Sequence, residues 1–193
     1  MINLNDICKS YGGRTVLSDL SLSVGRGERV CLTGPSGCGK STLLAIAAGV
    51  LEPDSGEVSI KEDARKAFLY QENRLLPWLD ALENITVAGV PADRAMEMLD
   101  KMGIAADAHK RPAQLSGGMC RRLAIARVLA FGGDIYYLDE PMQGLDADTA
   151  GRVMQVMQDE LHGKTALIVS HIEEEISALG TRTVALPARE KTE

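Results

Sequence analysis

The sequence predicts an α/β fold with a mostly parallel central sheet. A glycine-rich segment, residues 34–42, stands between a segment that alternates like a strand and one that opens like a helix. Two continuous apolar runs, 135–138 and 165–170, are typical of parallel strands buried on both faces. Helix-like segments separate these strands along the chain, so helices are expected on both faces of the sheet.

The first third of the chain is predicted to form mainly strands. Residues 2–8 and 20–24 are predicted strands joined around a turn at 11–13, and they indicate an N-terminal antiparallel β subdomain. Residues 28–33 alternate and lead directly into the glycine-rich segment. After a Pro-Asp-Ser-Gly turn, two further short strands are predicted, at 57–60 and 67–70.

The rest of the chain is mixed, with helices between buried strands. Met96, Leu99 and Met102 recur at helical spacing, and Gly103 follows them as a helix end. Helices are predicted at 41–48, 92–102, 116–130, 147–162 and 172–179, and a final strand at 181–186. We therefore expect a single domain over residues 1–193. Its core would comprise about 1–72 and 131–193, with a helical subdomain inserted at about 73–130.

Composition narrows the functional classes. With 45% hydrophobic and 25% charged residues, the chain has the make-up of a soluble globular protein. Its net charge of −6 gives no general basic excess, so no nucleic-acid partner is expected. The sequence has neither an apolar run long enough to span a membrane nor the profile of a signal peptide at its N-terminus. A cytoplasmic location and four free thiols are expected.

The glycine-rich segment is a phosphate-binding loop. It matches GxxxxGK[ST], in which backbone N–H groups surround phosphates, the lysine reaches the terminal phosphates and the next hydroxyl binds Mg²⁺. The alternative is a glycine-rich turn with a chance lysine, which the strand before and the helix after disfavour. The predicted ATP-binding residues of this loop are Gly34, Pro35, Ser36, Gly37, Cys38, Gly39, Lys40, Ser41 and Thr42.

Two acids end the apolar strand at 135–138. Asp139 and Glu140 would face the crevice where ligands sit in open α/β sheets. We expect Asp139 to bind Mg²⁺ and Glu140 to accept a proton from the water that attacks the γ-phosphate, or to orient that water. A strand that simply ends in solvated acids is the alternative, and the phosphate loop makes it the weaker one.

At this point the sequence resembles the ATP-binding cassette (ABC) family, the nucleotide-binding subunits of ABC transporters. The marker is Leu115-Ser116-Gly117-Gly118-Met119, close to the LSGGQ signature of that family. The resemblance covers nearly the whole chain and implies a P-loop NTPase. It also implies a head-to-tail pair of cassettes, in which ATP binds in trans to Ser116, Gly117, Gly118 and Asp146.

Three more residues match the family in order. The resemblance implies that Tyr11 stacks on adenine, that Gln71 contacts Mg²⁺ and water, and that His171 contacts the γ-phosphate. The predicted catalytic residues are thus Glu140, His171, Lys40 and Gln71, and the Mg²⁺ ligands are Ser41, Gln71 and Asp139. Structural alternatives are a turn tyrosine for position 11 and an inert histidine after a strand for position 171.

The implied function is ATP hydrolysis that energises solute transport. The partners would be a second copy or a paralogous cassette, a transmembrane permease and, indirectly, a solute-binding protein, with the chain on the cytoplasmic face of the membrane. The segment around Trp78 resembles importers of nitrate, sulfonate and taurine type, and its apolar residues would contact the permease or else fill a small core. The alternative is a soluble ABC ATPase of an assembly system, such as iron–sulfur assembly.

Two local features complete the expectations. Met119 and Cys120 depart from the family signature, and activity is still expected because the serine and glycines remain. Cys38 lies in the phosphate loop, where the helix N-terminus and Lys40 would favour its thiolate, so alkylation would block hydrolysis. A local basic cluster is expected near phosphate and partner contacts: Lys110, Arg111, Arg121, Arg122 and Arg127.

Overall fold

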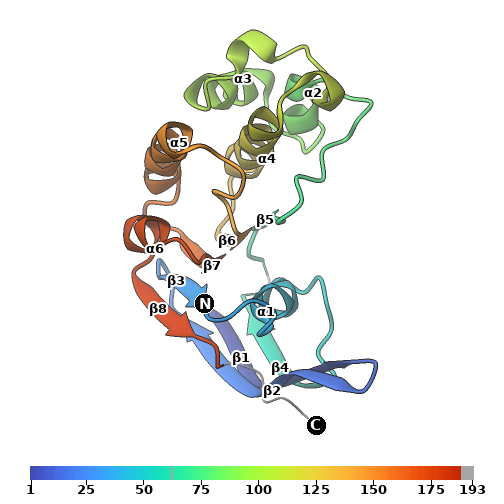
Figure 1. Cartoon of the computed structure of the whole chain (residues 1–193), viewed down its shortest axis with the longest axis vertical. Coiled ribbons are helices and arrows are strands. Elements are labelled where there is room, and N and C mark those ends of the chain that lie inside the picture. Colours follow the sequence, from blue (N-terminus) through green and yellow to red (C-terminus); the bar gives the residue numbers. More distant parts are fainter. Residues whose placement is uncertain (62, 188–193) are drawn as a thin grey trace.

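Two β-sheets organise the chain, in a computed structural model that describes residues 1–61 and 63–187 (Figure 1). The antiparallel sheet has the order β2-β1-β4, and the parallel sheet has the order β5-β6-β7-β3-β8. The first sheet contains β1 (Ile2–Tyr11), β2 (Arg14–Val24) and β4 (Ser55–Ile60). The second contains β3 (Arg29–Thr33), β5 (Lys66–Leu69), β6 (Ile135–Asp139), β7 (Thr165–Val169) and β8 (Arg182–Ala185).

The parallel sheet separates two apolar cores. All five residues of β6 are buried, and so are all five of β7, which explains their continuous apolar sequences. Successive side chains still point to opposite faces. Tyr136 and Leu138 pack in the core under the helices, whereas Ile135 and Tyr137 pack in the core shared with α1 and the antiparallel sheet.

Helices cover both faces of this sheet. On one side lies α1, and on the other lie α4, α5 and α6 (Figure 1). At the end of the molecule far from the antiparallel sheet, α2 and α3 pack against α4. The helices are α1 (Lys40–Ala48), α2 (Ala81–Thr86), α3 (Ala92–Lys101), α4 (Gly117–Phe131), α5 (Ala147–Glu160) and α6 (Glu173–Leu179), with 3₁₀ turns at Ala105–Asp107 and Pro112–Gln114.

The N-terminal hairpin is longer than the sequence predicts. β1 continues to Tyr11 and β2 begins at Arg14, so only Gly12 and Gly13 form the turn, both at positive φ. Apolar and polar residues do not alternate regularly along β1 and β2, because Asp6 and Asp19 also have positive φ and the pairing register shifts nearby. The predicted strand ends at residues 8 and 20 were therefore wrong.

The sequence analysis also missed α2. Asp80 accepts a hydrogen bond from the N–H of Glu83, and the Glu83 carboxylate accepts one from the N–H of Asp80. This reciprocal capping box starts a helix of only six residues. An acid followed three residues later by a glutamate was the pattern that could have revealed it.

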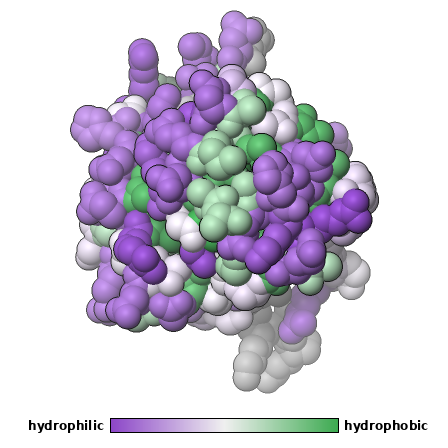
Figure 2. Space-filling model, turned by 90° about the horizontal axis from the view of Figure 1, so that it is seen from above, coloured by the Kyte–Doolittle hydropathy of each residue, from purple (hydrophilic) through white to green (hydrophobic). Residues whose placement is uncertain are grey.

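The surface at the α2–α3 end is mixed in character. Figure 2 shows this end mostly hydrophilic, with a patch of less polar residues near its middle. Trp78, which precedes α2, is 64% exposed, whereas Leu75 packs against the core of the helical region. Over residues 1–61 and 63–187, none of the helices combines the length and apolar character needed to cross a bilayer.

Candidate functional site

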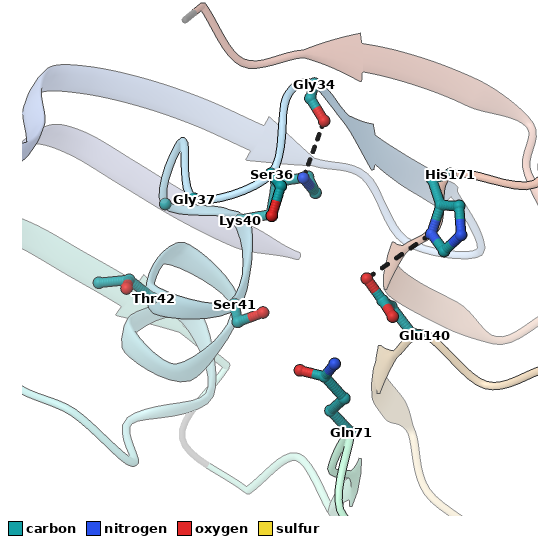
Figure 3. Close-up of a pocket in the computed structure, with 10 residues that line it drawn as sticks. Gly34, Ser36, Gly37, Lys40, Ser41, Thr42, Gln71, Glu140 and His171 are labelled. Carbon is teal, nitrogen blue, oxygen red and sulfur yellow. Dashed lines mark hydrogen bonds and ion pairs between the residues drawn. The ribbon is translucent and has the colours of Figure 1, made fainter. Parts of the chain in front are cut away.

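The glycine-rich loop connects β3 to α1 at the carboxyl edge of the parallel sheet (Figure 3). Gly39, at φ +107°, ends the loop, and a Cβ there would lie 2.8 Å from a side-chain carbon of Leu17. Gly34, at φ +134°, has the carbonyl oxygen of Leu186 2.6 Å from the same position. Side chains at both positions would be strained and crowded, so glycine is what allows this tight loop.

The loop and the start of α1 present positive charge. Lys40 Nζ donates to the carbonyl oxygens of Gly34, at 2.8 Å, and Pro35, at 2.9 Å (Figure 3). No side chain caps the N-terminus of α1, and no acidic residue lies in its first turn. The helix dipole and the lysine therefore act together on any anion in the loop.

Cys38 is buried, although it lies in the phosphate loop. The residue is 4% exposed, and it packs in the apolar core with residues of α1 and the antiparallel sheet. Its Sγ atom lies 4.0 Å from Lys40 Nζ. A reagent cannot readily approach a buried sulfur, so this burial argues against the expectation that alkylation there blocks activity.

Ser41 and Asp139 form a pair of hard oxygen donors. The Ser41 hydroxyl donates to the Asp139 carboxylate at 3.1 Å, joining α1 to the end of β6. Burial raises the pKa of the Asp139 carboxyl, and the hydrogen bond from Ser41 opposes this effect. A hydroxyl beside a desolvated carboxylate suits a divalent cation such as Mg²⁺, which prefers oxygen ligands.

Glu140 lies directly after β6 in an unusual conformation. Its φ is +45°, in the left-handed region that residues with side chains rarely adopt. Its N–H donates to the carbonyl of Val169 at 2.9 Å, and its carboxylate lies 3.6 Å from His171 Nδ1 (Figure 3). The turn thus directs a carboxylate toward the loop side of the sheet, where strain is retained at a site of expected chemistry.

A cavity of about 520 Å³ brings the predicted residues together. Gln71 approaches it from beyond β5, and Glu140 and His171 approach from beyond β6 and β7 (Figure 3). The lining residues are Gly34, Ser36, Gly37, Gly39, Lys40, Ser41, Thr42, Gln71, Glu140 and His171. An anion-binding loop, one carboxylate, an amide and a histidine therefore meet at one edge of the sheet, whereas Asp139 lies outside the lining and contacts it through Ser41.

Other predicted residues lie outside the lining of this cavity. Tyr11 is 50% exposed at the tip of the β1–β2 hairpin. Ser116 caps α4 by accepting from the N–H of Met119 at 3.2 Å, and Asp146 caps α5 by accepting from the N–H of Thr149 at 2.9 Å. Both capping residues are exposed, as is Gly117. Their positions suit contact with another molecule.

Glu175 was missed by the sequence analysis. It is 1% exposed in α6, and its carboxylate accepts a hydrogen bond from Ser170 Oγ at 2.6 Å. The same hydroxyl accepts from the N–H of Ile172, so the pair braces the segment that carries His171. Burial raises the pKa of Glu175 to about 7. Three acids in a row at 173–175 gave no indication that only the third is buried.

Glu175→Gln is expected to remove a pH dependence of stability. Because the folded pKa is raised, the stability linked to this group is full below the unfolded pKa and is lost as pH rises through about 7. The loss for the wild type between about pH 5 and pH 8 would be about 2 to 3 kcal/mol. Denaturant unfolding at both pH values measures it, with exposed Glu174→Gln as the control. An equal decline in Glu175→Gln would contradict this assignment.

Most residues of the basic cluster have partners within the chain. Lys110 pairs with Asp107 at 2.6 Å. Arg122 and Arg127 donate to backbone carbonyl oxygens, those of Met102 and Gly103 for Arg122 and those of Asn73 and Arg74 for Arg127. Arg121 is buried. Several of these charges thus satisfy carbonyls or a carboxylate within the chain, and the placement of the cluster near phosphate and partner contacts stays a prediction.

Comparison with known proteins gives consistent matches. The family model described as ABC transporter matches residues 17–143. The aliphatic sulfonates import ATP-binding protein SsuB 2 of Burkholderia cenocepacia (strain HI2424) is 43% identical over 199 residues, covering 96% of this chain and 73% of that protein. SsuB of Burkholderia pseudomallei (strain K96243) is 41% identical, and the match covers 97% of this chain and 60% of that protein.

Solved structures share the whole fold. A dimeric structure of MJ0796, described as a bacterial ABC transporter cassette, has a TM-score of 0.88 and 32% identity, and the match covers 97% of this chain and 94% of that one. A dimeric post-hydrolysis state of MJ0796 bound to ADP and Pi also has a TM-score of 0.88, with 31% identity. Its match covers 98% of this chain and 97% of that one.

Proposed function

The chain belongs to the ABC transporter family, and from this premise we propose that it hydrolyses ATP to energise solute import through a membrane transporter. The observation that carries the proposal is the cavity in which the phosphate loop faces Gln71, Glu140 and His171. The relatives named as import ATP-binding proteins favour this function over a soluble assembly ATPase. Their names also point to aliphatic sulfonates as the class of solute.

The phosphate loop holds the triphosphate. Lys40 now donates to two carbonyls of its own loop, and it can exchange them for phosphate oxygens, which are stronger acceptors. The free N–H groups at the N-terminus of α1 are further donors for the phosphate oxygens. Tyr11, exposed at the hairpin tip, offers a ring for adenine to stack on, which supports loose base selectivity.

Ser41, Asp139 and Gln71 would hold Mg²⁺. The first two already share a hydrogen bond, and Gln71 lines the same cavity. When bound, the ion neutralises charge on the phosphates. The family assignment supports nucleotide binding, and the donor set of this chain supports the metal.

Glu140 is positioned to take the proton of the attacking water. Its left-handed conformation aims the carboxylate into the cavity, 3.6 Å from His171. A carboxylate there orients a water and accepts its proton as the bond to the γ-phosphate forms. His171, held by the segment that Ser170 and Glu175 brace, is placed to donate to a γ-phosphate oxygen.

A second copy completes the site. Ser116, Gly117, Gly118 and Asp146 do not line the cavity. Ser116 and Asp146 cap α4 and α5, and the two glycines begin α4, so this group lies at helix N-termini suited to an anion or a facing loop. Two cassettes placed head to tail would bring this group onto the ATP of the other copy. The dimeric cassettes of similar fold support the arrangement.

The whole chain, residues 1–193, would act as one ATPase domain. Its sheet core, about 1–72 and 131–193, binds nucleotide, and the helical part, about 73–130, carries the signature loop. The permease would contact the helical part near Trp78, which would place the chain on the cytoplasmic face of the membrane. A solute-binding protein would act through that permease.

Trp78→Asp tests the transport role. The variant is expected to lose most co-purification with a polytopic membrane protein while its ATP turnover in solution stays within about twofold of wild type, since an exposed side chain is replaced. Val50→Asp, at a 55% exposed site elsewhere, is the matched control. Pull-down from detergent-solubilised membranes measures the effect. Recovery of only soluble partners by the wild type would contradict the proposal.

A further inference from the structure

Arg121 is a buried arginine at the junction of three segments. It lies in the second turn of α4 and is 3% exposed. Its Nε atom donates to the carbonyl of Pro141 at 2.9 Å. Its Nη2 atom donates to the carbonyl oxygens of Asp139, at 3.0 Å, and Glu140, at 2.7 Å. One edge of the guanidinium therefore holds the backbone on both sides of the strained Glu140.

The other nitrogen of the same group reaches the segment after β5. Nη1 donates to the carbonyl oxygens of Tyr70, at 2.8 Å, and Gln71, at 3.0 Å, and it lies 3.3 Å from the side-chain oxygen of Asn73. The planar guanidinium has five N–H donors in a fixed geometry, which suits several acceptors at set angles. The two segments that carry Gln71 and Glu140 are thus joined by one rigid side chain.

The sheet itself does not make this connection. The ladder between β5 and β6 ends at the pair Leu69 and Leu138, just before Gln71 and Glu140. On its other side Glu140 still bonds to Val169 of β7. Toward β5, the Arg121 side chain links the segment after β6 to the segment after β5, beyond the last residue pair of the two strands.

Burial of this charge has a cost that the carbonyls offset. Desolvation lowers the pKa of the Arg121 guanidinium, and the nearby carboxylates of Asp139, Glu175 and Glu140 oppose that effect. A buried cation is retained only where its donors are satisfied. Here three donor nitrogens have acceptors, and every acceptor belongs to the segments that carry Asp139, Glu140 and Gln71.

We propose that Arg121 is a positioning residue for ATP hydrolysis. This proposal rests on the proposed ATPase function. It fixes the backbone of Glu140 and Gln71 relative to each other, and so fixes the general base and the amide that face the cavity. Arg121 follows Ser116 by five residues in the same helical segment. A shift of α4, when its N-terminal loop meets a facing nucleotide, would reach both residues through this one side chain.

Arg121→Met and Arg121→Lys test the proposal against Arg122→Met. Arg122 is the control because it donates to the carbonyls of Met102 and Gly103, remote from the cavity. We expect kcat to fall by about tenfold to a hundredfold in Arg121→Met, with the affinity for a fluorescent ATP analogue nearly unchanged, because a small misplacement of a catalytic group is costly. Arg121→Lys should lie between, since an ammonium cannot reach all the acceptors.

A second readout does not depend on turnover. Amide hydrogen exchange in the nucleotide-free protein should be faster at 70–73 and 139–142 in both Arg121 variants, and unchanged there in Arg122→Met. Wild-type kcat in Arg121→Lys, or loss of kcat in proportion to lost nucleotide stoichiometry, would overturn the proposal. So would unchanged exchange. If Arg121→Met does not fold, both measurements are made on Arg121→Lys. If the wild type shows no ATP turnover, the ATPase function is refuted, and hydrogen exchange alone tests whether Arg121 positions the two segments.

Discussion

Glu140→Gln is expected to lower ATP turnover by about 10²- to 10⁴-fold, the usual contribution of a general base. The amide keeps the size of the side chain but cannot accept the proton of the attacking water. Nucleotide binding should persist, because the phosphate loop, Lys40 and Ser41 are unchanged. The variant should therefore hold ATP and accumulate in the ATP-bound, paired state.

Single-turnover hydrolysis and sedimentation with saturating ATP and Mg²⁺ measure these two effects. Glu173→Gln is the matched control, because Glu173 is an exposed acid of α6 outside the lining of the cavity. It should turn over ATP at close to the wild-type rate. Full residual turnover in Glu140→Gln would remove Glu140 from the role of base.

Gly117→Asp is expected to lower turnover by about 10²-fold or more while the isolated chain still folds and binds ATP. Beyond its chain neighbours and its own helix backbone, a Cβ at Gly117 would meet no atom of the described residues within 4 Å. The helix dipole also stabilises an acid in the first turn of α4. The substitution thus costs the monomer little. Facing the triphosphate of another copy, however, the new carboxylate would repel it, and such repulsion is strong where water is excluded.

Gly151→Asp provides the matched control for this change. Gly151 is an exposed glycine in α5, and a Cβ there also meets nothing within 4 Å. Steady-state ATPase activity and binding of a fluorescent ATP analogue by the monomer separate the two variants. If Gly117→Asp hydrolysed ATP as fast as Gly151→Asp, the signature loop would have no part in the reaction.

Much of the fold follows from local sequence patterns. The mainly apolar runs of β6 and β7 are buried, as a parallel sheet covered on both faces requires. The phosphate loop lies between a strand and a helix, as its motif requires. The N-terminal hairpin was harder to predict. Asp6 and Asp19 have positive φ in a hairpin whose register shifts, and the alternation of residues along one segment does not show such shifts.

The site was predicted in part, for a related reason. Residues of the phosphate loop, Gln71, Glu140 and His171 do gather in one cavity, because the carboxyl ends of parallel strands meet at one edge. Arg121 and Glu175 were missed because charged residues usually lie at the surface. The burial of Arg121 depends on carbonyls supplied by distant segments, and that of Glu175 on the hydroxyl of Ser170, and composition and spacing reveal neither.

A site shared between two copies predicts that two inactive variants regain activity when they are mixed. Lys40→Met disables the phosphate loop of a copy, and Gly117→Asp disables its signature loop. A head-to-tail pair of the two variants retains one complete site, formed by the loop of one copy and the signature of the other. Neither variant alone can form such a site.

Mixing the two variants in equal amounts and measuring ATP turnover therefore tests the central claim most directly. Activity should rise from near zero for each variant alone to about a quarter of the wild-type value, since about half of the pairs are mixed and each mixed pair has one working site of two. Turnover that stays at the sum of the separate variants, in solution and with the membrane partner, would contradict a site shared between two copies.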